Sequence, residues 1–478
     1  KEVGIRKTLG TTRPRLISQF LMESVMVSVL SMIVALGIAE LFTFAFFWIT
    51  GQQLSINLWT SLWSIIAVLG FSIVVGLVAG MYPAFYLTSF QPVKVLKGTF
   101  AGSQRRSFLN SLVVFQFAIS ITLIICTIII ARQLSFMSNK DLGFNEENTL
   151  TIDNIDLTEN RFRAFKDEVL QHPDVVNASL HTGEPGSKAV ITFYTFQTSE
   201  MPNALTINTY FGDEDYLDVM GFRLVDGRGF KEGMASDTAS VIINEAAARA
   251  LGIADDPIGA VLNEKQTVIG VVQDFHWESL RNSIDPAVIL VPNERLRRPV
   301  YSQLAIKIKS PGVSSLLDYL KSRWEVFVPG EPMEYHFLDE NFGALIKKEE
   351  VMGKAVGIFT GLAIAISCLG LFGLAAYTTE QRTREIGIRK TLGASSANIV
   401  LMLNGQFTRL VLMATLAAVP ISYYAAREWL AGFAYRADLS ILIFLIGGMS
   451  GLIISFCTVA FHSVKAAQTN PSEILKCE

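Results

Sequence analysis

The sequence lacks the short motifs that mark most nucleotide-binding and metal-dependent enzymes. Its 478 residues contain no G-x-x-x-x-G-K-[ST] phosphate loop, no G-x-G-x-x-G turn and no H-E-x-x-H metal motif. The five histidines are scattered, and His276 and Glu278 have no third ligand in view, so we interpret that stretch as a loop that packs its aromatic residues. We therefore predict no catalytic residue, no metal site and no cofactor.

Cysteine is equally scarce, with four residues in the whole chain. Cys126, Cys368 and Cys457 lie within apolar runs and Cys477 lies near the last residue, so none falls between residues 141 and 350. This distribution excludes a disulfide framework or a zinc site with the usual cysteine spacing in that interval.

Charged residues are also few, at 17%, whereas half of the residues are hydrophobic. A membrane-crossing helix needs about 20 mostly apolar residues. For the run at 407–430, which contains Arg409, Pro420 and Arg427, a buried core helix is the alternative. Six stretches satisfy the length requirement: 18–48, 61–82, 108–131, 353–378, 407–430 and 439–462.

The charged residues that are present predict the orientation of these helices. Lys and Arg are retained on the cytoplasmic side of short loops, and here they cluster before the first helix, between the second and third, between the fourth and fifth, and after the sixth. Both chain ends are therefore predicted to be cytoplasmic, with residues 140–350 on the other side. Residues 141–350 have a net charge of −15 and the remainder of the chain +12. The acidic interval does not suggest nucleic-acid binding, and the basic segments are explained by topology and by a cytoplasmic partner.

A seven-residue sequence, GIRKTLG, occurs at residues 4–10 and again at residues 387–393. Each copy precedes two apolar runs, and each unit ends alike, with QPVKVLKG from residue 91 and NPSEILKC from residue 470. The second unit is preceded by a further helix and the long polar interval. Since the chain begins at Lys1 inside the first unit, we expect the sequence to be part of a longer protein.

Residues 140–350 alternate short β-branched runs with amphipathic stretches, which predicts a soluble α+β domain, in two lobes because of its length. Within it, Asn244 is expected to cap a helix that stops at Gly252. The acidic stretch DEDYLD at 213–218 lacks the glycine and closing glutamate of a calcium loop, and we interpret it as a solvated face. The strands are predicted from VNASLHT, AVITFYTFQT, SVIINE, QTVIGVVQDF, AVILV and SQLAIKIK, and the helices from RFRAFKDEVLQH, NEAAARALG and VSSLLDYLKSRWEVF.

Three pairs of glycines at GxxxG spacing lie in the apolar runs: Gly76 with Gly80, Gly357 with Gly361, and Gly447 with Gly451. Such pairs allow helices to approach closely, although glycine is common in membrane helices in any case.

With these features together, the sequence resembles the FtsX-like, or MacB-type, permease subunits of bacterial ABC transporters. The resemblance rests on the repeated segment REIGIRKTLGAS and its Pro-Leu-Lys endings, and on the phrases YLDVMGFRLVDGRGF, VIINEAAARALG, DPIGA and VIGVVQDFHWESLR. It covers essentially the whole chain. The family normally has four membrane helices in each unit, so a protein of two complete units would have eight helices and two outer domains, where this chain has six and one.

The resemblance implies that the repeated segments are short cytoplasmic helices that dock into grooves of an ATP-binding subunit. Such coupling helices would use apolar side chains for contact, basic ones for anchoring and a final glycine as a stop. The alternative is a basic segment that serves only as a topological signal. The residues so assigned are Glu2, Gly4, Arg6, Lys7, Leu9 and Gly10 in the first copy, and Glu385, Ile386, Gly387, Ile388, Arg389, Lys390, Leu392 and Gly393 in the second.

We therefore expect a membrane protein with an α-helical bundle of six helices and one large extracytoplasmic α+β domain, in the bacterial inner membrane. The implied partners are a cytoplasmic ABC ATPase dimer and the lipid bilayer, with a periplasmic adaptor or other extracytoplasmic protein as a further partner, and no nucleic acid. The expected domains are the end of a first FtsX-like unit at 1–107, a membrane helix at 108–139, the α+β domain at 140–350 and a second FtsX-like unit at 351–478 with its coupling helix at 380–403.

Two functions remain open at this point. One is a non-catalytic permease subunit that transmits ATP-driven motion of the cytoplasmic subunits to its outer domain, for export or release of a lipoprotein, peptide, antibiotic or similar amphiphile. The other is a regulatory complex that activates an outer partner such as a cell-wall hydrolase. A secondary transporter would need paired charges at mid-membrane, and the first run offers only Glu23 and Glu40, near its ends.

Overall fold

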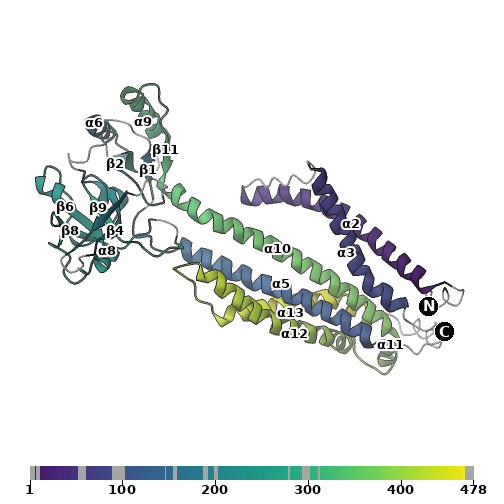
Figure 1. The fold of residues 1–478 in the computed structure, drawn as a ribbon. Helices are drawn as coiled ribbons and strands as arrows, with labels where there is room; N and C mark the ends of the chain where they lie inside the picture. Colours follow the sequence, from purple (N-terminus) through teal and green to yellow (C-terminus); the bar gives the residue numbers. More distant parts are fainter. Residues whose placement is uncertain are drawn as a thin grey trace. The chain divides into compact units, whose positions relative to one another are not determined.

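The computed structural model describes residues 6, 11–51, 61–88, 103–145, 147–153, 159–186, 192–198, 203–277, 280–292, 302–309 and 313–468. It divides into two compact units (Figure 1). Unit 1 is helical and comprises residues 1–127, 351–422 and 441–478, and unit 2 comprises residues 128–350 and 423–440.

Long helices dominate the described chain, and six of them are long and apolar enough to cross a membrane. Each of the six predicted runs matches one of them, although the runs at 61–82 and 439–462 begin one and two residues before their helices. The run at 407–430 belongs to a continuous helix despite its internal Pro420. The prediction of six membrane helices is therefore confirmed. The helices are α2 (Arg13–Thr50), α3 (Leu62–Thr88), α5 (Ser103–Ser138), α10 (Leu338–Gln381), α11 (Thr383–Thr391), α12 (Ser396–Ala431) and α13 (Ile441–Gln468), of which the nine-residue α11 is too short to span.

Helices α2 and α3 pack as a close pair through the glycines of α3. A Cβ atom added at Gly76 would lie 2.7 Å from the Cα of Val25, and one at Gly80 would lie 2.6 Å from the Ser24 hydroxyl oxygen. The Ser28 hydroxyl also donates to the carbonyl oxygen of Ser72 at 2.7 Å. The predicted role of this glycine pair in close helix packing is confirmed.

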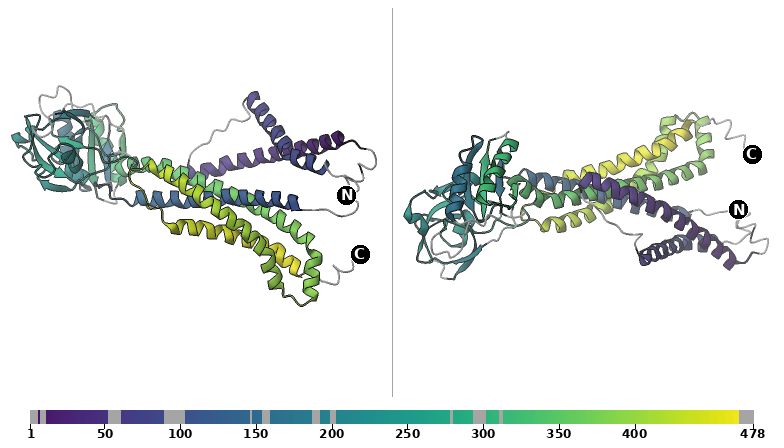
Figure 2. Two further views of the ribbon diagram at one scale, coloured as in Figure 1. Left: turned by 60° about the horizontal axis from the view of Figure 1, so that its bottom comes forward. Right: turned by 90° about the horizontal axis from the view of Figure 1, so that it is seen from above.

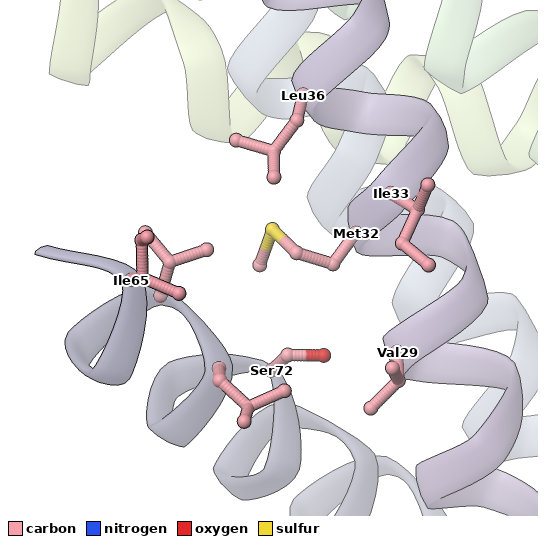
Figure 3. A pocket seen from close by; sticks show the side chains of 8 residues that line it. Val29, Met32, Ile33, Leu36, Ile65 and Ser72 are labelled. Atoms are coloured by element: carbon pink, nitrogen blue, oxygen red, sulfur yellow. The ribbon is translucent and has the colours of Figure 1, made fainter. Parts of the chain in front are cut away.

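Beside the Ser28–Ser72 contact, α2 and α3 line an open, mostly apolar pocket of about 120 Å³ (Figure 3). Met32 and Leu36 of α2 face Ile65 of α3 across it. Many other apolar side chains of the pair are exposed, such as Leu41 at 72% and Trp63 at 80%. An apolar surface of this kind suits a lipid environment rather than water.

The helices α5, α10, α12 and α13 run alongside one another (Figure 2). They contact one another through small and hydroxyl-bearing residues. A Cβ atom at Gly451 of α13 would lie 2.8 Å from the Ile121 side chain of α5, and Gly447 is similarly covered by Ile125. Between α5 and α10, Ser120 bonds Ser367 at 2.9 Å and Thr127 bonds Thr360 at 2.8 Å. Hydroxyl pairs of this type hold helices together where hydrocarbon offers no polar partner.

The glycine pair of α10 behaves differently from the other two. Gly361 has no atom within 4 Å of an added Cβ, and Gly357 has only Thr127, at 4.0 Å. No other helix of the described residues therefore packs closely on these two glycines, and that part of the prediction is wrong.

Unit 2 contains an α+β domain built on two sheets. The first sheet has the order β11-β1-β10-β2, and every pairing in it is antiparallel. Helices α6 and α9 supply Phe162, Phe165, Leu316, Leu320 and Trp324 to its core. Its elements are β1 (Thr149–Ile152), α6 (Glu159–Val169), β2 (Val175–His181), β10 (Gln303–Ile308), α9 (Val313–Phe327) and β11 (Tyr335–Phe337).

The second sheet has seven strands, in the order β3-β4-β9-β6-β8-β5 with β7 paired to β8. Asn263, with φ at 53°, lies in the turn between β7 and β8 and bonds the main chain at the end of β3. Its N–H donates to the Gln197 carbonyl, its Oδ1 accepts from the Gln197 N–H, and its Nδ2 donates to the Thr195 carbonyl, so the turn covers the edge of β3 at that end. Its elements are β3 (Thr192–Phe196), β4 (Leu205–Phe211), α7 (Tyr216–Met220), β5 (Leu224–Gly227), the short 3₁₀ helix η1 (Ala235–Ala239), β6 (Ser240–Asn244), α8 (Glu245–Ala250), β7 (Val261–Leu262), β8 (Gln266–Val272) and β9 (Ala287–Leu290).

All six predicted strands and all three predicted helices of this domain are present, and α9 spans the predicted residues 313–327. The strands β1, β4, β5, β7 and β11 were not predicted. The interpretation of residues 213–218 as a solvated face is wrong in part, because Asp213 and Tyr216 are 1% and 0% exposed.

Asn244 shows how one side chain fixes the second sheet. As predicted, it caps α8, where its Oδ1 accepts from the Ala247 N–H at 2.9 Å, and Gly252 follows the helix at φ 73°. The same Oδ1 accepts from the Ala287 N–H at 2.9 Å, and its Nδ2 donates to the Asp285 carbonyl at 3.0 Å. Asn244 therefore joins β6, α8 and the start of β9.

We predict that Asn244→Ala destabilises the α+β domain by about 2–3 kcal/mol, because it removes a cap and leaves buried N–H groups without an acceptor. The measurement is chemical denaturation of residues 140–350 expressed alone, a fragment that we expect to unfold cooperatively. The matched control is Asn203→Ala at an exposed position, which should stay within about 0.5 kcal/mol of the original. Equal midpoints for the two variants would contradict this role of Asn244.

Candidate functional site

The second copy of the repeated segment forms the nine-residue helix α11, Thr383–Thr391. Glu385 lies in its first turn and Arg389 and Lys390 in its last, so the charges complement the helix dipole at both ends. Gly393 follows at φ 90°, and the Ala394 N–H returns to the Arg389 carbonyl at 3.0 Å. The predicted stop at Gly393 is therefore present as a left-handed turn after the helix.

The apolar side chains of this segment divide between the interior and the surface. Ile386 is 1% exposed and packs against Ile399 and Leu403 of α12, which fixes α11 to its own chain. Ile388 is 46% exposed and Leu392 is 82% exposed. Two of the three apolar side chains assigned to a partner contact are thus available, while Ile386 anchors the helix.

The charged side chains border this exposed apolar surface. Arg389 pairs with Glu385 at 2.9 Å, one turn apart on the helix, and both are exposed. The predicted range 380–403 is not one helix, because it contains the end of α10, α11, and the beginning of α12 after the turn at Gly393. The exposed surface of α11 is therefore small: among the residues of known burial it includes Glu385, Ile388, Arg389 and Thr391, and Leu392 extends it just past the end of the helix.

In the first copy, only Arg6 lies within the described residues, and its guanidinium donates to Gln19 Oε1 at 2.8 Å. Arg389, its counterpart in the second copy, contacts Glu385 instead. Glu2, Gly4, Lys7, Leu9 and Gly10 lie outside the described residues.

A second group of functional interest, which the sequence did not indicate, is a partly buried ionic cluster in the first sheet. The two ring nitrogens of His336 on β11 face two carboxylates, with Nδ1 2.6 Å from Asp153 and Nε2 against Glu184, which is 0% exposed. Thr151 also donates to Glu184, and Gln303 donates to Asp153 at 2.6 Å. These residues come from distant parts of the chain, and no short motif links them.

The cluster holds His336 in its charged form. Burial alone would lower its pKa, but the hydrogen bonds and charges of Asp153 and Glu184 outweigh burial and raise the pKa to about 10. For Asp153, burial raises the pKa, and the hydrogen bonds from His336 and Gln303 overcome this and lower it. His336 lies two residues before Leu338, the first residue of α10, so its ion pairs fix the main chain at the junction between β11 and α10.

A buried ion pair also joins α6 to the loop before α7. Lys166 bonds Asp213 at 2.8 Å and Asp215 at 2.6 Å. Asp213 accepts further hydrogen bonds from the Ser179 hydroxyl at 2.7 Å and the Leu180 N–H at 2.9 Å. Burial would lower the pKa of Lys166, but the two carboxylates raise it. Both carboxylate oxygens of Asp213 already accept hydrogen bonds from these groups, so we assign Asp213 a structural role.

Comparison with known proteins places these elements in a family. The model of the FtsX-like permease C-terminal domain matches residues 1–92 and 357–471, and that of the MacB-like periplasmic core domain matches residues 111–316. The ABC transporter permease YknZ of Bacillus subtilis is 35% identical over 283 residues, which cover 56% of this chain and 69% of YknZ. The chain belongs to the FtsX-like ABC transporter permeases. It is accordingly a multi-pass membrane protein of a bacterial family.

Other relatives of this FtsX-like permease carry the name macrolide export ATP-binding/permease protein MacB. The protein from Neisseria gonorrhoeae is 23% identical over 286 residues, which cover 57% of this chain. The chain spans 44% of the length of that relative.

Among solved structures, the periplasmic region of MacB from Actinobacillus actinomycetemcomitans aligns with 41% of this chain and 91% of its own, at 17% identity and a TM-score of 0.32. The extracellular domain of YknZ from Gram-positive bacteria aligns with 40% of this chain and 98% of its own, at 16% identity and a TM-score of 0.28.

We predict that the ionic cluster makes the stability of the permease α+β domain depend on pH. Because the pKa of His336 is about 10 in the fold and about 6.5 when unfolded, its contribution is complete below pH 6.5 and is lost as the pH rises towards 10. The lowered pKa of Asp153 has the opposite sign, and its contribution is lost in acid. Denaturation of residues 140–350 should therefore show stability falling from pH 6.5 to 10.

The variants His336→Ala and His336→Gln test this prediction. His336→Ala leaves the buried Glu184 without its counterion, and we expect a loss of roughly 3 kcal/mol at pH 6 that shrinks towards pH 10. His336→Gln retains a hydrogen-bond donor without the charge, so it should lose less. A stability difference between His336→Ala and the original that is independent of pH would contradict a charged His336.

Proposed function

We propose that this chain is the non-catalytic membrane subunit of an ABC transporter, driven by a separate cytoplasmic ATPase dimer. ATP hydrolysis in that partner would be coupled through α11 and its first-copy counterpart to movement of the α+β domain, for export or release of a lipoprotein, peptide, antibiotic or similar amphiphile. The domain boundaries are those expected from the sequence, namely 1–107, 108–139, 140–350 and 351–478.

The observation that carries this proposal is the exposed surface of α11. Ile388 of α11 and Leu392, the residue directly after the helix, are apolar and solvent-accessible beside Arg389, and Ile386 anchors the helix to α12. A leucine that is 82% exposed at the end of a nine-residue helix is scarcely buried by the described chain, whereas it suits a helix that inserts into a groove. The same seven residues recur at 4–10, and a homodimeric partner would present two equivalent grooves to receive the two copies.

The relatives support the transport function. The MacB proteins are named for macrolide export and combine ATP-binding and permease parts, whereas YknZ is named as a permease. The greater identity to YknZ, 35% over 69% of its length, supports the arrangement with the ATPase on another chain. A regulatory complex that activates an outer partner such as a cell-wall hydrolase shares all these features and is the alternative.

We predict an orientation in the inner membrane with both chain ends in the cytoplasm and the α+β domain outside. In a background without native thiols, a membrane-impermeant reagent applied to intact cells should label a cysteine at Glu232 but not one at Ser395, both of which are exposed. Labelling of the Ser395 position with protection of Glu232 would reverse the orientation.

We predict that α11 is required for coupling. Gly387→Pro should break the helix through its lost N–H and ring clash, and Arg389→Glu should introduce repulsion towards Glu385 and towards an acidic groove. Leu392→Ala removes only an exposed side chain, and we expect it to lower permease-dependent ATP hydrolysis at least about fivefold, the equivalent of roughly 1 kcal/mol.

The matched control for Leu392→Ala is Leu401→Ala, at a leucine of α12 that is 63% exposed. It should leave hydrolysis unchanged. If the chain with Gly387→Pro and Arg389→Glu still assembles and supports hydrolysis at the original rate, the repeated segments are topological signals and the coupling proposal fails.

A further inference from the structure

The nine residues between α12 and α13, 432–440, belong to unit 2, and they hold one fully buried side chain among exposed and half-buried ones. Phe433 is 1% exposed and belongs to the same hydrophobic core as Phe275, Trp277 and Leu280 of the α+β domain. The ring of Trp429, near the end of α12, packs edge-on against the Phe433 ring, with 4.8 Å between the ring centroids. Through Phe433 this loop is therefore attached to the domain core, although about eighty residues separate it from the domain in sequence.

Arg281 of the α+β domain contacts both the loop and α10. It makes a ring contact and a main-chain hydrogen bond to the loop, and an ion pair to α10. Its guanidinium lies 4.7 Å from the centroid of the Phe433 ring, and its carbonyl accepts from the Ala434 N–H at 2.7 Å. Its Nε pairs with Glu349 of α10 at 2.9 Å, and the Glu349 side chain is only 7% exposed. Breaking a pair in which one charge is this deeply buried is costly.

Gln133 of α5 binds the other half of the loop. Its side chain is 0% exposed, its Nε2 donates to the Tyr435 carbonyl at 2.8 Å, and its Oε1 accepts from the Ala437 N–H at 2.8 Å. The Tyr435 ring is covered by the Lys140 ammonium at 4.2 Å and by the His276 ring at 4.9 Å. A single amide thus satisfies two main-chain groups of the loop.

Loops that connect helices are usually mobile and variable. This one is held at three elements, namely α5 through Gln133, α10 through Arg281 and Glu349, and the domain core through Phe433. Buried hydrogen bonds are strengthened by the low dielectric around them, and leaving one unmade costs the desolvation of both groups. The loop is therefore not free to slide over the domain.

We propose that residues 432–440 form a clasp through which the helices α12 and α13 move the α+β domain. This inference rests on the proposed function, in which α11 receives the motion of the ATPase. Four residues separate the end of α11 from the start of α12, which runs as one helix of 36 residues to the edge of the clasp. A continuous helix of that length, about 54 Å at 1.5 Å per residue, transmits displacement of one end to the other.

The test uses the full chain in complex with its ATPase, with the native cysteines replaced and a fluorescent label at an Asp255→Cys site, which is exposed in the domain. The signal is the change in fluorescence on adding ATP, measured together with ATP hydrolysis. Gln133→Leu removes both loop hydrogen bonds, and Arg281→Ala removes the ring contact and the pair with Glu349. Arg223→Ala, which breaks the exposed Arg223–Asp141 pair and leaves the contacts of Gln133 and Arg281 unchanged, is the matched control.

We expect Gln133→Leu and Arg281→Ala to reduce the fluorescence change at least fivefold while hydrolysis stays within twofold of the original and Arg223→Ala behaves as the original. Gln133→Glu keeps the acceptor for Ala437 and loses the donor to Tyr435, so its response should be intermediate. If Gln133→Leu and Arg281→Ala show the same ATP-dependent fluorescence change as the unmodified chain, the clasp proposal is wrong. Loss of hydrolysis together with the response would also overturn it, because these residues would then serve assembly. If the unmodified chain shows no ATP-dependent response, the proposed function itself fails, and the clasp with it.

Discussion

Hydrocarbon offers no hydrogen-bonding partner to a peptide group, and the architecture of this permease follows from that constraint. Six helices satisfy their own backbone and present apolar side chains outward, so the contacts between helices rely on glycine packing and hydroxyl pairs such as Ser120 with Ser367. Polar and ionic interactions are correspondingly concentrated in the α+β domain, where His336, Lys166 and Arg281 form ion pairs with buried or partly buried carboxylates. The few polar residues at the helix ends, such as Gln133 and Glu349, contact that domain or its attached loop.

The sequence predicted the features that depend on long or repetitive local signals. Charge-free runs of about 20 residues identify membrane helices whatever their neighbours are, and the β-branched runs and the Asn244 cap identify strands and a helix by local chemistry. The undetected strands are short or of mixed polarity: β11 has three residues, and β4 reads LTINTYF, with Thr and Asn interrupting its apolar positions. Such strands are specified by their partners across the sheet rather than by their own pattern.

The candidate sites were predicted unevenly for the same reason. The repeated segment could be found because it recurs, but its division into a buried Ile386 and an exposed Leu392 depends on Ile399 and Leu403, which come from the following helix. The cluster around His336 joins residues up to 183 positions apart, and the loop contacts of Gln133 span up to 304. A single sequence contains no signal for pairs at that separation, and the apparently ordinary loop GFAYRADLS gave no hint that its phenylalanine enters another core.

The Asn263 turn has a consequence for how these domains can associate. An unpaired edge strand exposes a row of N–H and C=O groups that invites a strand from a neighbouring molecule, and β3, with its exposed Phe193, would be such a template. Because Asn263 occupies the main-chain groups of residues 195–197, β3 cannot extend its sheet there into a second chain. A turn of two residues with positive φ, Asn263 and Glu264, thus blocks strand pairing with a second chain at this end of β3.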